Sequence, residues 1–168
     1  MGDMTRILNH ESVWRGKPQT RFPEITTGIP SIDAAYHVAL DVLTDACSSK
    51  FALPGEEGMW SAGAFQGKGM GFGVWRRDTM QIFLRGGVLW EPEVSRKTLQ
   101  YIMKSGKDNA VDGIAAPVIS CWEYYLATHD VETVRGMWPH IQEQMREAES
   151  YFDIERGLMR AAYNSAND

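Results

Sequence analysis

The sequence predicts an all-α fold of about five helices arranged as antiparallel hairpins. Apolar residues recur at steps of three and four through most of positions 31–152, which is the spacing of one helix face. No segment has the pattern of a convincing sheet. Long polar loops follow the first, third and fifth predicted helices, and short turns join the others. The long loops are therefore expected at one end of the array, where functional side chains tend to lie.

The chain is expected to begin with an extended arm at 1–30, followed by a helical domain at 31–168. The arm has little apolar pattern and holds three prolines. Ser31 is placed to cap the first helix, which should end near Lys50. The apolar face of this helix steps by four, four, three and four residues, through Ile32, Tyr36, Leu40, Leu43 and Cys47.

A long glycine-rich loop at 51–77 precedes the second helix. Alternate glycines at its end lead into the segment Trp75-Arg76-Arg77-Asp78. The second helix should run from about Thr79 to Val88, with Asp78 or Thr79 as its N-cap. An aromatic, two guanidiniums and a carboxylate at a helix start predict a polar site at the rim of the scaffold. The alternative reading is a structural cap with a surface ion pair. Two loop carboxylates, Glu56 and Glu57, are further site candidates, although solvated glutamates are commoner.

The remaining helices follow from caps and breakers. The third should start at Pro92 and stop at Gly106, and Asp112 is placed to cap the fourth, which extends to about Leu126. Asp130 should cap the fifth helix. Two prolines bear on these helices: Pro117 is tolerated only in a first turn, and Pro139 should bend or divide the fifth helix. A turn at 153–158 and a short strand or extended segment at 158–163 complete the prediction.

Composition limits the classes of function. The chain of 168 residues fits about one domain, and its net charge of −5 disfavours a nucleic-acid partner. No apolar run is long enough to span a bilayer, so no membrane partner is expected. The glycine spacing lacks the third glycine of a dinucleotide fingerprint. Cys47 and Cys121 share no metal-type spacing, which predicts no metal site and two buried free thiols that suit a cytoplasmic location.

Aromatic side chains are abundant, with six Trp, six Tyr and six Phe. Their faces suit core packing, which is the commoner use, and they equally suit stacking against sugar rings.

The order of several motifs resembles that of the six-hairpin (α/α)6-toroid glycoside hydrolases, especially glucoamylase-like enzymes. Trp75-Arg76-Arg77-Asp78 is similar to the Trp-x-Arg-Asp segment of that family. Asp112-Gly113, the run from Trp122 to Asp130, and Trp138-Pro139 agree with the order and spacing of its alternating helices. The resemblance covers most of 31–168 and implies a partial (α/α)6 toroid, with about two and a half of the six hairpins.

The resemblance implies an exo-acting, inverting hydrolase of α-linked glucosides or a related sugar, working without cofactor or metal. Arg77 and Asp78 would bind hydroxyls of the terminal sugar, and Trp75 would form a wall of the pocket. Trp60 is a further candidate for the wall, and Asp112 for the rim. Asp168 is the candidate general acid. The catalytic base has no counterpart here, so the chain is expected to be a fragment with little activity alone.

Two other readings stay open. The same loop would serve a non-catalytic carbohydrate-binding module, or the chain is a plain helical scaffold whose aromatics are all core. A partial toroid would expose apolar inner helix faces, which favours self-association.

Overall fold

The structure, a computed structural model, describes residues 22–46, 54–63, 72–105 and 111–160, and it is mostly helical. The predicted all-α class is confirmed. The helical elements are α2 (Pro30–Asp41), the π-helical turn η1 (Val42–Ala46), α3 (Arg76–Leu84), α4 (Gly87–Trp90), α5 (Pro92–Ser105), α6 (Val111–Thr128) and α7 (Val131–Ser150). The strands form two short antiparallel pairs, β1 (Ala62–Gly63) with β2 (Phe72–Gly73) and β3 (Phe152–Asp153) with β4 (Leu158–Met159).

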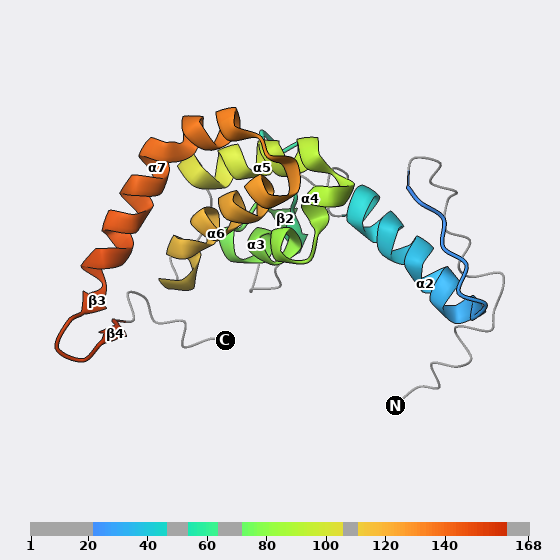
Figure 1. Cartoon of the computed structure of the whole chain (residues 1–168), viewed down its shortest axis with the longest axis horizontal. Helices are drawn as coiled ribbons and strands as arrows, with labels where there is room; N and C mark the ends of the chain where they lie inside the picture. Colours follow the sequence, from blue (N-terminus) through green and yellow to red (C-terminus); the bar gives the residue numbers. More distant parts are fainter. Residues whose placement is uncertain (1–21, 47–53, 64–71, 106–110, 161–168) are drawn as a thin grey trace.

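Helix α6 is the centre of the packing, because it contacts α3, α4, α5 and α7. Figure 1 shows these helices gathered together, with α2 lying to one side and the β3–β4 hairpin at the far end of α7. The hydrophobic core between them has fully buried members that include Trp60, Val74, Phe83, Val88, Leu99 and Ile102, and polar residues such as Ser95 and Thr98 are buried as well. This core fixes the start of α3, which carries the predicted polar site.

The N-terminal end of α2 differs from the prediction. The helix begins at Pro30, and its N-cap is Ile29, which makes no side-chain cap, so the predicted Ser31 cap is wrong. Asp33 closes the end instead: its Oδ1 accepts hydrogen bonds from the hydroxyl of Thr27 at 2.7 Å and from its backbone N–H at 2.9 Å. These bonds lower the pKa of the Asp33 carboxyl.

The predicted second helix is two helices, because the chain turns at Gly86. This residue has φ +83°, a left-handed conformation that costs glycine little. A Cβ at the next residue, Gly87, would lie 2.4 Å from Cγ2 and 2.9 Å from the carbonyl oxygen of Ile82, so only glycine fits the close approach of α4 to α3.

Both internal prolines lie within continuous helices. Pro117 is the seventh residue of α6, beyond the first turn, so the prediction that this proline is tolerated only in a first turn is wrong. Pro139 lies inside α7 without dividing it. Pro117 cannot donate a backbone hydrogen bond, but its side chain is fully buried in α6, which packs against α3, α4, α5 and α7. Two other predicted boundaries hold: α5 ends at Ser105, just before Gly106, and the carbonyl oxygen of Asp153 accepts the backbone N–H of Gly157 in the turn of the terminal hairpin.

Asp130 caps α7 as predicted. Its Oδ1 accepts the backbone N–H of Thr133 at 3.0 Å, and its Oδ2 accepts the hydroxyls of Thr133 at 2.6 Å and Tyr124 at 3.0 Å. The preceding residue, His129, has φ +55° and is the one non-glycine residue with a positive φ among the described residues. The cap therefore holds a sharp reversal between α6 and α7.

Replacing Asp130 with alanine should lower the unfolding free energy by about 1 kcal/mol at neutral pH, the usual worth of an N-cap. Hydrogen bonds from Thr133 lower the pKa of Asp130. A carboxyl group whose pKa is lower in the folded protein than in the unfolded chain, where it is about 4, stabilises the fold above that unfolded-state pKa. This contribution to stability is lost as the pH falls through the folded-state pKa. Urea unfolding at several pH values should show that the difference in unfolding free energy between wild type and Asp130→Ala becomes smaller in acid. Asp130→Asn is the control, because asparagine can cap the helix but does not titrate. A difference between wild type and Asp130→Ala that does not change with pH would contradict the role of the Asp130 carboxylate as the cap.

An apolar groove of about 390 Å³ runs between α6 and α7. Trp122 and Trp138 stand at its edge with 57% and 55% of their surface exposed. The groove is lined by Val118, Cys121, Trp122, Tyr125, Val131, Val134, Trp138 and Ile141. Cys121 is a buried free thiol, as predicted, and burial raises its pKa to about 11. Cys47 lies outside the described residues. Self-association through such a face stays a prediction.

Within the described ranges, no helix has the length and apolar character needed to cross a bilayer.

Candidate functional site

The predicted polar segment lies at the N-terminal end of α3. Strand β2 and the fully buried Val74 lead into Trp75, which has the extended conformation of an N-cap residue. The carbonyl oxygen of Trp75 accepts the backbone N–H of Thr79 at 2.9 Å and its hydroxyl at 2.7 Å. The helix therefore starts at Arg76, and the predicted cap at Asp78 or Thr79 is wrong. Asp78 is instead in the first turn, where the helix dipole favours a carboxylate.

The two adjacent arginines have different surroundings. Arg76 turns into the scaffold, where its Nε donates to the carbonyl oxygen of Ile102 at 3.0 Å and its Nη1 to Oε1 of the buried Gln144 at 3.3 Å. Arg76 thus ties α3 to α5 and α7. Arg77 and Asp78 are each partly exposed. Among the described residues, the partly exposed Asp78 carboxylate has no hydrogen-bond or ion-pair partner.

Arg76→Ala should cost about 1.5 kcal/mol of unfolding free energy, since hydrogen bonds from a charged donor are lost and Gln144 keeps a buried amide without its partner. Urea denaturation followed by circular dichroism measures the loss. Arg85→Ala, which removes an exposed arginine at the other end of α3, is the control, and we expect it to cost less. An equal or greater loss for Arg85→Ala would contradict the assignment of Arg76 as the residue that joins these helices.

Trp75 is partly exposed, and its indole nitrogen is buried without a hydrogen-bond partner among the residues described. Buried donors without an acceptor are rare in folded proteins and call for an explanation, one of which is a functional site. Trp75, Arg77 and Asp78 therefore place an indole, a guanidinium and a carboxylate within one turn of the chain.

Trp60 is not available to a sugar, in contrast to the prediction. Its side chain is fully buried, its Nε1 donates to the hydroxyl of Ser95 at 2.9 Å, and its backbone N–H donates to the hydroxyl of Thr98 at 2.7 Å. Trp60 is held in the core because α5 carries polar residues at intervals of three on its buried face. That spacing is visible in the sequence, but the sequence alone does not show that the loop carrying Trp60 packs on this face.

Glu56 is buried and Glu57 is exposed. The Oε2 of Glu56 accepts the backbone N–H of Val74 at 3.0 Å, and its Oε1 accepts the hydroxyl of Tyr101 at 2.7 Å. Both oxygens thus face the protein rather than a ligand. The Oε2 of Glu57 accepts the backbone N–H of Gly55 at 2.9 Å. Sequence reasoning proposed Glu56 for the site but missed Tyr101, whose hydroxyl completes the contact.

The two remaining candidates lie elsewhere. Asp168, the candidate general acid, is outside the described residues. Asp112 is the second residue of α6, so the helix begins before it and the predicted cap is wrong. Its side chain is not among those described. Trp75, Arg77 and Asp78 are the predicted site residues that lie at the start of α3 with partly exposed side chains, and their common role in a site stays a prediction.

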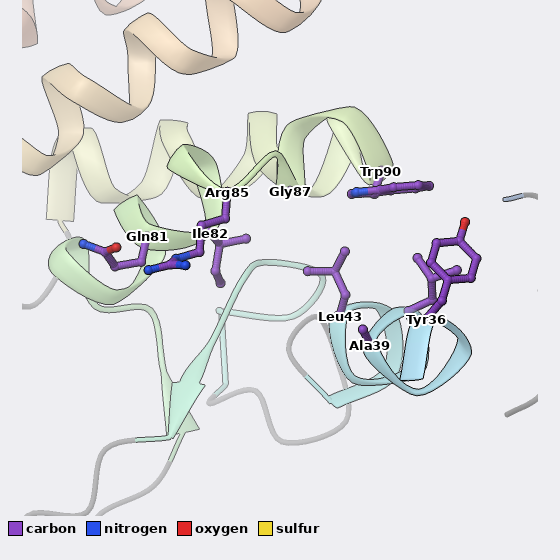
Figure 2. Close-up of a pocket in the computed structure, with 9 residues that line it drawn as sticks. Tyr36, Ala39, Leu43, Gln81, Ile82, Arg85, Gly87 and Trp90 are labelled. Carbon is purple, nitrogen blue, oxygen red and sulfur yellow. The ribbon is translucent and has the colours of Figure 1, made fainter. Parts of the chain in front are cut away.

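A second groove, of about 380 Å³, lies at the opposite end of α3 (Figure 2). Tyr36, Ala39 and Leu43 form one wall and Gln81, Ile82, Arg85 and Trp90 the other. Trp90 is held edge-on by Phe22 and Tyr36, at ring-centroid distances of 5.4 Å and 6.2 Å. This groove includes none of the predicted site residues. Because it lies at the C-terminal end of α3, it is separate from the Trp75–Asp78 segment.

Among the described residues, no group of three or more histidine, cysteine, aspartate or glutamate side chains is placed to hold a metal ion.

Comparison with known proteins found no matching family model, no similar curated protein and no similar solved structure.

Proposed function

We propose that this chain binds the terminal sugar of a carbohydrate through Trp75, Arg77 and Asp78, as part of a six-hairpin glycoside hydrolase. The observation that carries the proposal is the start of α3, where a partly exposed indole, guanidinium and carboxylate follow one another and the Asp78 carboxylate has no partner among the described residues. The resemblance of this segment to the Trp-x-Arg-Asp motif supports the same assignment.

The chemistry of the three side chains suits a sugar. A carboxylate accepts hydrogen bonds from two neighbouring hydroxyls, and a guanidinium donates to hydroxyl oxygens in a fixed fork. An indole face covers the C–H face of the ring. Arg76 supports this arrangement from behind, because its bonds to α5 and α7 fix the first turn of α3.

These residues bind rather than cleave. Inverting hydrolysis needs a general acid and a general base whose carboxyl groups lie roughly 6.5–9.5 Å apart across the bond. Asp78 is assigned to the sugar hydroxyls, Asp168 remains the candidate acid, and no residue is assigned as the base. We therefore expect the chain to bind a sugar with little or no turnover.

The test is a titration of the chain with glucose, maltose and cellobiose, followed by tryptophan fluorescence and by assay of released glucose. The proposal predicts a saturable change with glucose or maltose that is absent from the Trp75→Phe variant. Binding with no released glucose is also what a non-catalytic carbohydrate-binding module would give. No response to any sugar would favour the plain helical scaffold and refute the proposal.

A further inference from the structure

A buried carboxylate holds the segment that leads into the proposed sugar site. Glu56 is 3% exposed, and the backbone N–H that it accepts belongs to Val74, the residue immediately before Trp75. Its other oxygen accepts the hydroxyl of Tyr101 on α5. Glu56 thus joins α5 to the residue that precedes Trp75, beside the direct bond from Arg76 to Ile102.

The loop that carries Glu56 is itself fixed to α5. Trp60 donates to Ser95 through its indole and to Thr98 through its backbone, and both acceptors are fully buried. Ser95, Thr98 and Tyr101 follow one another at intervals of three, so they form a row along one face of the helix. All three bind the Pro54–Ser61 stretch, so Glu56 lies on a segment that is fixed to α5.

We propose that Glu56 is a positioning residue that sets the backbone of the Trp75–Asp78 segment for sugar binding. This inference rests on the proposed function for its effect on affinity, but its effect on the backbone stands separately. Without the carboxylate, the buried Val74 N–H and the Tyr101 hydroxyl each lose an acceptor. The segment would then have to move to find water, and the indole, guanidinium and carboxylate would lose their arrangement.

Three variants test the proposal. Glu56→Ala removes both contacts. Glu56→Gln keeps them, because the amide oxygen still accepts from Val74 and the amide nitrogen donates to the Tyr101 oxygen, whose hydroxyl reverses. Glu57→Ala is the matched control, since it changes the neighbouring exposed glutamate of the same loop. Circular dichroism establishes that each variant is folded at the temperature of measurement. If Glu56→Ala does not fold, Tyr101→Phe replaces it, because it removes one of the two contacts of Glu56 and keeps the one to Val74.

Two readouts are compared with wild type: hydrogen exchange at Val74–Asp78 and the affinity for the best sugar found in the titration. In Glu56→Ala we expect exchange there to rise at least about tenfold, with exchange in α7 unchanged, and affinity to fall about tenfold. Glu56→Gln should restore both to within about threefold of wild type.

Exchange and affinity in Glu56→Ala that match those of Glu57→Ala would overturn the inference. So would an equal rise of exchange in α7, since that reports general destabilisation. If the wild-type chain binds no sugar, the proposed function fails, and the exchange at Val74–Asp78 alone decides whether Glu56 holds the segment.

Discussion

Replacing Arg77 with alanine is expected to weaken sugar binding by about 10- to 100-fold. The factor corresponds to the roughly 1.5–3 kcal/mol that hydrogen bonds from a charged donor contribute. Arg77 is partly exposed at the start of α3, whereas the bonds that join this helix to α5 and α7 come from Arg76. Isothermal titration or fluorescence titration with the best sugar measures the change in affinity.

The matched control for Arg77→Ala is Arg85→Ala. Arg85 is exposed at the other end of the same helix, so its loss changes the net charge equally but should leave sugar affinity unchanged. Asp78→Asn should also weaken binding, because the amide keeps the shape of the carboxylate but accepts hydrogen bonds at one oxygen only. Equal affinities for Arg77→Ala and wild type would remove Arg77 from the site.

Trp60→Ala is expected to lower the unfolding free energy by about 3–5 kcal/mol, the usual cost of truncating a buried large aromatic. The indole is fully buried in the core, and its N–H is bonded to Ser95. Total stabilities of single domains are only about 5–15 kcal/mol, so this variant should be largely or partly unfolded at 37 °C. Urea denaturation at 10–25 °C, followed by circular dichroism, measures the loss.

Two further variants separate the causes of that loss. Trp60→Phe keeps most of the apolar volume and removes the bond to Ser95, so it should cost clearly less than Trp60→Ala. Trp138→Ala removes the same residue type where 55% of it is exposed, and its cost should stay below about 1 kcal/mol. A small effect of Trp60→Ala would mean that Trp60 is not part of the core, and its predicted place in the sugar wall would be open again.

The start of α7 and the end of α5 could be predicted from the sequence because local signals agree there. In α7 the apolar residues keep steps of three and four over twenty residues, and Asp130 provides an N-cap with a hydroxyl partner three residues on. The stop of α5 before Gly106 follows from the same kind of signal. Such consistency between pattern and cap is what makes a helix readable without tertiary information.

The start of α3 and the roles of its residues could not be predicted, because long-range contacts decide them. Asp78 and Thr79 have the chemistry of N-caps, but the helix begins earlier, at Arg76. Its N-cap residue is Trp75, whose carbonyl oxygen accepts the hydroxyl of Thr79. Arg76 and Arg77 are chemically identical, and only the positions of Ile102 and Gln144 show that Arg76 is the one that joins α3 to α5 and α7.

The candidate site was predicted in part. The segment Trp75–Asp78 was singled out from residue types alone, and the structure places it at a helix start with partly exposed side chains. Trp60 and Glu56 were misplaced because a loop rich in glycine and aromatics reads as a surface feature. The contacts that bury them come from α5, whose polar residues gain meaning only when the loop is seen against that helix.

The most direct test of the central claim is the indole N–H region of a ¹H–¹⁵N correlation spectrum recorded during a sugar titration. The chain has six tryptophans, and Trp75→Phe and Trp60→Phe identify the two signals of interest. The proposed site predicts that the Trp75 signal shifts and saturates with added sugar while that of the buried Trp60 stays in place. A Trp75 signal that does not move at sugar concentrations that saturate other signals, or a spectrum with no moving signal at all, would contradict it.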